Sequence, residues 1–235
     1  MKNDGFDRRS FLKGSVAGSA AALTAALPQT AQAQQNGLTA EALPAGYAYL
    51  NPEEAAFVEA LVDHLVPADE LTPKGTDIGI NVYIDRALAG GWGKGDRLYM
   101  QGPWKTGVPS QGYQLPLTPA ELYRYGIAAA NAFCRKAYGK AFYQIAKGQR
   151  EEFLLDLQAG KVQFEGGPPA RVFFSLLYQN VMEGMFADPM YGGNRDKAGW
   201  KLIGFPGVIA VHRENVEKFR GKKFDAKPLG IPDMS

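Results

Sequence analysis

The first 33 residues of the chain resemble an export signal, and the kind of signal constrains how the rest must fold. A short charged region carries a twin-arginine pattern, which consists of Arg8, Arg9, Phe11, Leu12 and Lys13. An apolar run, Ser15–Leu27, leads to the small residues Ala31 and Ala33, which suit cleavage after Ala33. Proteins with twin-arginine signals are generally exported already folded. We therefore expect the mature chain to fold in the cytoplasm, to use the twin-arginine export machinery and to act in the periplasm.

Two other interpretations of this segment fit the sequence less well. An ordinary secretory signal with a chance arginine pair is disfavoured because Phe11-Leu12-Lys13 stands in the right register after the pair. A transmembrane anchor is disfavoured because the run Ser15–Leu27 is shorter than the roughly 20 apolar residues that a bilayer requires. The twin-arginine interpretation is therefore preferred.

The composition of the remaining chain argues against a site for a nucleic acid, metal or nucleotide. Residues 34–235 suffice for one domain with a full core. The signal holds four of the 26 basic residues and two of the 24 acidic ones, so the rest is balanced and lacks the basic excess that nucleic-acid binding needs. His64, His212 and Cys134 are the only histidines and cysteine, and they do not form a metal or haem-attachment spacing. No glycine-rich nucleotide loop is present either.

A chain without cofactor sites conflicts with an export route for folded proteins, which usually serves proteins that acquire a cofactor before export. The simplest resolution is that the cofactor belongs to a partner. We expect that partner to fold against this chain and to be exported with it, and we expect no cofactor in this chain.

Helix signals dominate the mature sequence and predict an all-α fold, an irregular helical bundle with long loops rich in glycine and proline. Asn51-Pro52-Glu53-Glu54 and Thr118-Pro119-Ala120-Glu121 are both typical of capped helix starts. On the second of these helices, Arg124, Asn131 and Arg135 are expected to face water. The predicted helices run from Pro52 to Pro67, from about Asp77 to Gly90, from Pro119 to about Tyr138, through Phe153 and Leu157 to Gly160, and onward from Pro169.

These patterns divide the mature chain into three parts. Residues 34–49 are small and polar and predict a flexible lead, whereas residues 50–221 carry the helices and form the domain. Residues 222–235 contain Pro228 and Pro232 and predict an extended tail, which either wraps a partner or is disordered.

Two features of the domain indicate contact with another protein. The stretch from Gly90 to Pro119 has no helix pattern but contains Trp104 and other aromatic residues, which favours a partner-binding loop over a plain surface loop. The helix after Pro169 is apolar around almost its whole circumference, from Val172 to Met185. It should therefore be buried nearly everywhere, either by its own domain or with the help of a partner.

One segment is specific enough to suggest a family. Glu183–Gly207 resembles the signature of the gluconate 2-dehydrogenase subunit 3 family, the small subunits of bacterial flavin-dependent sugar and sugar-acid dehydrogenases. The resemblance extends from about Leu50 to Phe224 and includes Asp85–Gly90. The residues that carry the signature, and that we expect to support partner docking together with Trp104, are Asp188, Pro189, Tyr191, Gly192, Gly193, Asn194, Arg195 and Trp200.

The resemblance implies a role as the non-catalytic small subunit of a dehydrogenase complex. The large subunit would hold FAD, with or without an iron–sulfur cluster, and oxidise gluconate or another sugar compound. Electrons would pass to a multihaem cytochrome c subunit that carries haem c. The small subunit would be needed for maturation and folded export of the large subunit, and it would reach the inner membrane only through the complex.

The signature residues also allow two interpretations that do not depend on the family resemblance. In the structural one, Gly184 and Asp188-Pro189 end the apolar helix, the Gly192-Gly193-Asn194 segment takes positive φ angles in a turn, and Trp200 clamps the loop onto the bundle. In the other, the chain is a stand-alone periplasmic enzyme or sugar-acid-binding protein with a carboxylate site near Glu183 and Asp188. The absence of a histidine or nucleophile beside them favours the structural interpretation.

Cys134 is an unpaired cysteine in an exported chain, and two roles remain open for it. It is either a buried, inert thiol or one half of a disulfide bond to the large subunit. Its position on an apolar row of the predicted helix is compatible with both.

Overall fold

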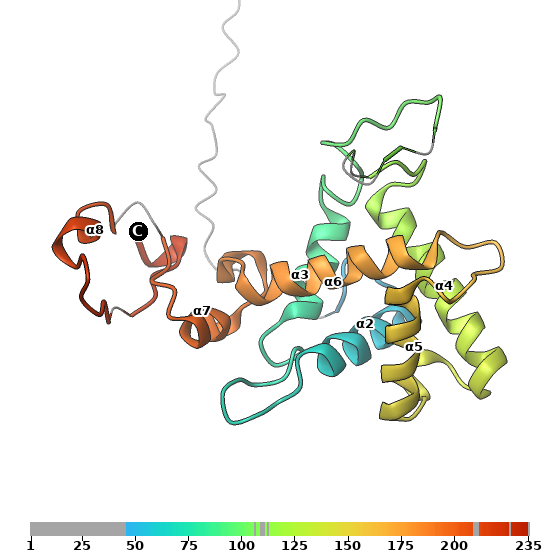
Figure 1. The fold of residues 1–235 in the computed structure, drawn as a ribbon, viewed down its shortest axis with the longest axis horizontal. Helices are drawn as coiled ribbons and strands as arrows, with labels where there is room; N and C mark the ends of the chain where they lie inside the picture. Colours follow the sequence, from blue (N-terminus) through green and yellow to red (C-terminus); the bar gives the residue numbers. More distant parts are fainter. Residues whose placement is uncertain are drawn as a thin grey trace, which may run out of the picture. The chain divides into compact units, whose positions relative to one another are not determined.

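The computed structural model describes residues 46–105, 107–108, 111, 113–208, 212–225 and 227–234 (Figure 1). The predicted signal peptide, residues 1–33, and most of the predicted lead lie outside the described residues. The chain divides into two compact units, residues 1–41 and 42–235, and every described element belongs to the second. Among the described residues, extended pairing is limited to an isolated bridge between Gly207 and Leu229. The prediction of an all-α fold is confirmed.

The apolar helix α6 is the central element of this unit. It contacts α3 and α5 most extensively and also α4 and α7 (Figure 1). None of the helices in the described ranges is both long enough and apolar enough to cross a membrane. The α-helices are α2 (Pro52–Leu65), α3 (Ile80–Ala89), α4 (Pro119–Tyr138), α5 (Lys147–Ala159), α6 (Ala170–Phe186), α7 (Ala198–Ile203) and α8 (Asn215–Lys218), and the short 3-10 helices are η2 (Phe142–Gln144), η3 (Pro189–Tyr191), η4 (Arg195–Lys197) and η6 (Ile231–Met234).

Aromatic side chains from several helices meet in the core. The ring of Phe57 on α2 lies 4.5 Å from that of Phe142 and 6.2 Å from that of Phe173, measured between centroids. Tyr123 on α4 meets Phe173 edge to face, and Phe153 on α5 packs on Phe142. Such aromatic pairs stabilise a core by about 0.5–1.5 kcal/mol each beyond the burial of their area. This cluster joins α2, α4, α5 and α6.

The predicted helix starts are confirmed at α2 and α4. The side chain of Asn51 accepts hydrogen bonds from the backbone N–H groups of Glu53 and Glu54, and the Glu54 carboxylate accepts one from the N–H of Asn51. Thr118 and Glu121 form the same reciprocal box at α4. These caps satisfy N–H groups that have no partner inside a helix.

The start of α3 differs from the prediction. The sequence placed it after Thr76 or Asp77, but α3 begins at Ile80. The residues before it form a hydrogen-bonded turn, in which the N–H of Gly79 donates to the carbonyl of Thr76. Gly79 itself has a φ of 83°, a left-handed conformation that glycine adopts without strain.

Asp85 on α3 holds the chain segment that leads into α2. Its side chain is buried, and its two carboxylate oxygens accept hydrogen bonds from three successive backbone N–H groups, those of Ala48 (2.7 Å), Tyr49 (2.9 Å) and Leu50 (2.9 Å). Hydrogen bonds to an ionised acceptor are stronger than neutral ones. Residues 48 and 49, the end of the predicted lead, are therefore attached to α3.

Asn131 is a second buried polar residue whose role the sequence did not reveal. It was expected to face water, but it is fully buried on α4. Its side-chain oxygen accepts a hydrogen bond from the N–H of Phe142, and its amide donates to the carboxylate of Glu53 at 3.2 Å. The prediction for Asn131 was wrong because helical periodicity does not show which polar side chain will bind the backbone of a distant loop.

We predict that Asp85→Ala lowers the free energy of unfolding by roughly 3 kcal/mol, because three backbone donors lose a charged acceptor. Asp85→Asn should lower it less, since the amide keeps one accepting oxygen. Urea unfolding followed by circular dichroism measures both changes. Glu152→Ala, at an exposed position of α5, is the control and should change stability by less than about 0.5 kcal/mol. An Asp85→Ala variant as stable as this control would contradict the anchoring role.

Candidate functional site

The part of the signature from Asp188 to Arg195 lies between α6 and α7, and Asp188 binds two separate backbone segments. One carboxylate oxygen of Asp188 accepts a hydrogen bond from the N–H of Met190 at 3.1 Å and so caps η3. The other oxygen accepts a hydrogen bond, 2.7 Å long, from the N–H of Ile231 in the C-terminal tail. Pro189 occupies the first position of η3, where its missing N–H is not needed. Asp188 therefore joins the signature to the tail.

Glycines in the signature allow two backbone segments to meet. A Cβ atom on Gly193 would lie 2.2 Å from the carbonyl oxygen of Gly184 on α6, so no larger residue fits there without a shift of the backbone. Gly192 has a φ of 102°, which a residue with a side chain rarely adopts. The predicted turn is present, with positive φ angles at Gly192 and Asn194 but not at Gly193, and it packs against α6.

Asn194 fixes the turn to the helices on both sides. It is fully buried, its amide donates to the carbonyl of Ala187 (2.8 Å), and its oxygen accepts from the N–H of Gly199 (2.9 Å). Its φ of 47° lies in the left-handed region, which asparagine tolerates better than most residues. The side chain thereby satisfies one backbone group after α6 and one in α7.

Arg195 and Trp200 complete the attachment of this loop. The guanidinium of Arg195 donates to the carbonyl of Asp77 at 3.0 Å, in the turn before α3. The buried indole of Trp200 donates to the carbonyl of Phe186 at 2.7 Å, and its ring packs edge to face on Phe205. Trp200 therefore clamps the loop onto the end of α6.

Glu183, half-buried on α6, belongs to a separate polar network. Its carboxylate accepts hydrogen bonds from Gln179 (2.7 Å), Asn180 (2.9 Å) and the hydroxyl of Tyr83 (3.3 Å). Burial and the nearby Glu183 carboxylate raise the pKa of Tyr83 to about 12. The buried Asn180 also accepts a hydrogen bond from the hydroxyl of Tyr123 at 2.9 Å. The network links α3, α4 and α6.

The structure gives Glu183 and Asp188 different partners and does not join them in a shared site. Each carboxylate accepts hydrogen bonds from its own set of groups, and none of these groups is common to both. Gly184, which was expected to help end the apolar helix, lies inside α6 and packs against Tyr83 and Ile80 of α3. That expectation was wrong because the missing side chain serves close helix packing.

The predicted docking residues differ in their exposure to solvent. Gly193, Asn194 and Trp200 are buried, and Asp188, Pro189 and Gly192 are half-buried. Tyr191, Arg195 and Trp104 are exposed. Trp104 borders an open cleft in which Tyr113, Pro169 and Val172 also take part. Partner contact stays a prediction for the docking residues, and Tyr191, Arg195 and Trp104 are the most accessible of them.

The C-terminal tail is attached to the signature at several points. The ammonium of Lys197 lies 2.5 Å from the carboxylate of Asp233, in addition to the bond between Asp188 and Ile231. The N–H of Val208 donates to the carbonyl of Leu229. The tail predicted over 222–235 is thus folded back on its own chain at 229–233.

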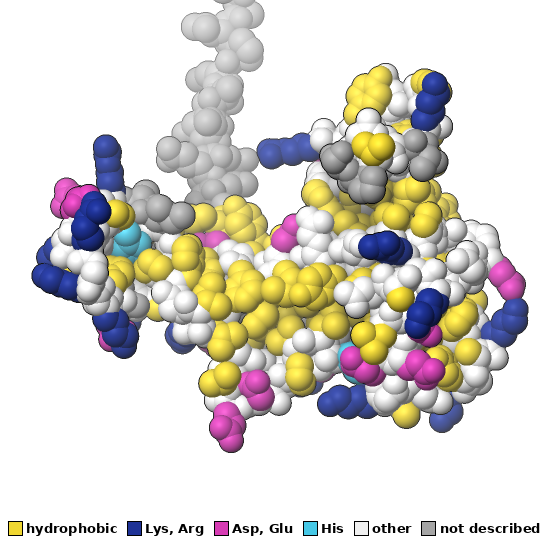
Figure 2. All heavy atoms as spheres, viewed as in Figure 1, with side chains coloured by type: hydrophobic (Ala, Val, Ile, Leu, Met, Phe, Trp, Pro, Cys, Tyr) yellow, Lys and Arg dark blue, Asp and Glu magenta, His cyan; other side chains and the backbone are white. Residues whose placement is uncertain are grey.

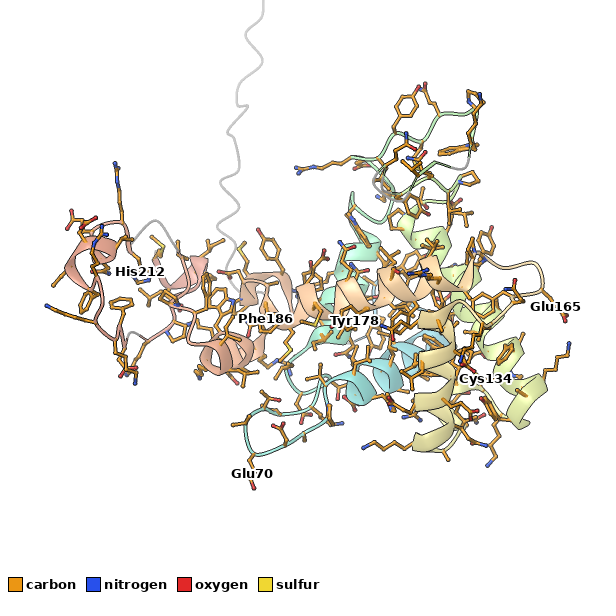
Figure 3. The ribbon with its side chains drawn as sticks, in the orientation of Figure 1. Glu70, Cys134, Glu165, Tyr178, Phe186 and His212 are labelled. Carbon is orange, nitrogen blue, oxygen red and sulfur yellow. The ribbon has the colours of Figure 1, made fainter. Side chains whose placement is uncertain are left out.

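Cys134 lies on α4 inside the bundle (Figure 3), and its side chain is 0% exposed. It is a free thiol, and burial raises its pKa to about 12. A disulfide bond to another subunit would require this side chain to leave the core. Of the two roles that the sequence left open, the position favours the buried thiol.

Both histidines have structural partners. The Nε2 atom of His64 lies 2.6 Å from a carboxylate oxygen of Glu151 and so links α2 to α5. His212 packs on Phe224, and its Nε2 atom lies 3.2 Å from the carbonyl of Pro206. Across the described ranges, no group of three or more histidine, cysteine, aspartate or glutamate residues could hold a metal ion.

The family model for gluconate 2-dehydrogenase subunit 3 matches residues 52–207, about two thirds of the chain. The match begins at the first residue of α2 and ends just after α7, so it contains the whole signature. No curated protein and no solved structure matches the chain.

We predict that Asp188→Ala releases the C-terminal tail, because the N–H of Ile231 loses its acceptor. Amide hydrogen exchange at Ile231 should become at least tenfold faster, since it reports the opening of that bond. Asp77→Ala, at an exposed aspartate near the same loop, is the control and should leave the rate unchanged. Equal exchange in both variants would show that Asp188 does not hold the tail.

We also predict that Cys134 reacts with thiol reagents at pH 8 at least about a hundredfold more slowly in the folded chain than in urea, since burial and a raised pKa suppress the thiolate. Absorbance of the released thiolate chromophore measures the rate. On a non-reducing gel of the complex, we expect this chain at its own mass. Fast labelling of the folded chain, or a disulfide-linked band, would contradict the burial argument.

Proposed function

The chain belongs to the gluconate 2-dehydrogenase subunit 3 family, and from this membership we propose that it is the non-catalytic small subunit of a periplasmic flavoprotein dehydrogenase. The large subunit holds FAD and oxidises gluconate or a related sugar compound. A multihaem cytochrome c subunit accepts the electrons. FAD and haem c are thus held by partner subunits, and no residue of this chain is assigned to either.

The observation that carries the non-catalytic role is the use of the signature side chains. Asp188 caps η3 and binds the tail, Asn194 binds backbone groups on both sides of the turn, and Trp200 binds the carbonyl of Phe186 at the end of α6. A catalytic acid, base or nucleophile must instead reach a substrate. These contacts support a signature that maintains the shape of the subunit.

The role in export is supported by the sequence of the first 33 residues. The pattern around Arg8 and Arg9 is a receptor-read address for folded proteins. In the proposal the large subunit acquires its cofactor in the cytoplasm, binds this chain and leaves the cytoplasm with it. The complex then stays assembled in the periplasm, and it associates with the inner membrane through its other subunits.

The experiment is a double substitution of the arginine pair, Arg8→Lys with Arg9→Lys, in cells that also produce the flavoprotein. We expect gluconate-dependent dye reduction in the periplasmic fraction to fall at least tenfold, because the signal receptor no longer recognises the pair. The flavoprotein should accumulate in the cytoplasm. Arg213→Lys makes the same chemical change at an exposed position and should have no effect.

A flavoprotein that reaches the periplasm fully active when this chain is deleted would overturn the proposed role. Gluconate-dependent dye reduction by the isolated chain would contradict its non-catalytic character.

A further inference from the structure

The central helix α6 keeps one strip of apolar side chains uncovered. The sequence predicted burial around nearly its whole circumference, but Tyr178 is 49% exposed and Met182 is 36% exposed. They lie one helical turn apart, and Val181 and Met185 continue the same face toward the interior. Figure 2 shows hydrophobic side chains gathered over α6 and α7, with acidic side chains at the lower edge of the patch.

A groove runs beside this strip. The loop that follows α2 forms one wall, Leu202 of α7 lies in the other, and the volume of the groove is about 260 Å³. Asp69 is the one charged residue among the described residues that line it. The lining residues are Leu65, Val66, Pro67, Asp69, Leu71, Thr72, Tyr178, Val181, Met182, Met185 and Leu202.

The loop wall presents a leucine to solvent in a fixed conformation. One carboxylate oxygen of Asp69 accepts hydrogen bonds from the N–H groups of Leu71 (2.8 Å) and Thr72 (2.7 Å), and the N–H of Asp69 donates to the carbonyl of Thr72. These bonds order the loop without any contribution from the side chain of Leu71, which is 75% exposed. Because the backbone of this loop is already ordered, covering Leu71 costs a partner less conformational entropy than ordering a free loop would.

The charges around the groove restrict what can cover it. The second carboxylate oxygen of Asp69 accepts no hydrogen bond from any described residue, and Glu70 at the tip of the same loop is exposed (Figure 3). A symmetric contact between two copies of this chain would bring both pairs of carboxylates to one interface, where like charges repel. A partner with a basic group at this end would be attracted instead.

We propose that this groove docks an amphipathic helix of the large subunit, with an apolar row on Tyr178, Met182 and Leu71 and a lysine or arginine at the end that meets Asp69 and Glu70. An exposed helical strip between two walls is the geometry that accepts a helix in a groove. Methionine side chains adapt to the shape of such a ligand. The assignment rests on the proposed function, which supplies the partner subunit.

The test is co-purification of the flavoprotein with tagged variants of this chain, measured as flavin absorbance per mole of chain. Leu71→Glu places a charge on the loop wall and Met182→Glu places one on the α6 strip, and each should reduce the bound flavoprotein at least tenfold. Leu155→Glu is the matched control, because Leu155 is an exposed leucine on α5 outside the groove. It should bind within twofold of the unsubstituted chain.

A charge substitution tests whether the docked helix carries a lysine or arginine at the end that meets Asp69 and Glu70. Glu70→Lys should slow association with the large subunit about threefold to tenfold at low ionic strength, and the difference should shrink in 0.5 M salt. Circular dichroism melting curves that match the unsubstituted chain confirm that each variant is folded.

The outcomes separate the groove from the proposed function. If the unsubstituted chain binds no flavoprotein, the proposed function fails. If it binds the flavoprotein and folded Leu71→Glu and Met182→Glu bind it equally well, the groove assignment alone is overturned. It is also overturned if the isolated chain is a dimer that Leu71→Glu dissociates while flavoprotein binding is unchanged, because the groove then holds a second copy.

Discussion

A helix that is apolar around almost its whole circumference is stable in water only where other elements cover it, and α6 imposes that requirement on the rest of this fold. Helices α3, α4 and α5 cover most of its length, and the aromatic cluster around Phe173 joins them to it. The carboxylate of Glu183 accepts hydrogen bonds from Tyr83 of α3 and Asn180 of α6, which lie where these helices meet. What remains is the strip at Tyr178 and Met182, where we expect another subunit to supply the missing cover.

The family signature has a physical explanation in this arrangement. It covers the end of α6 by placing the backbone of Gly193 against the carbonyl of Gly184, and it holds that contact with Asn194 and Trp200. Asp188 extends the attachment to the C-terminal tail. The loops between these helices have many backbone groups that need hydrogen-bond partners, and short polar side chains such as these are able to supply them.

The comparison of sequence and structure shows where local patterns suffice. Capping boxes at Asn51 and Thr118 predicted the starts of α2 and α4 because a cap involves residues three positions apart. The start of α3 was misplaced, since a hydrogen-bonded turn replaces the side-chain cap there. Asn131, Gly184 and the groove beside α6 were not predictable, because each depends on a neighbour distant in sequence.

The sequence by itself determined the all-α class and the family, since periodicity, caps and the Asp-Pro-x-Tyr-Gly-Gly-Asn motif are local. Only the tertiary structure decided which polar side chains form hydrogen bonds with the backbone and which side chains are buried or exposed. It placed Asp188 on backbone donors, buried Cys134 and left Leu71 exposed. The physical reason is that hydrogen-bond partners and solvent exposure depend on how distant segments pack, which residue order alone does not specify.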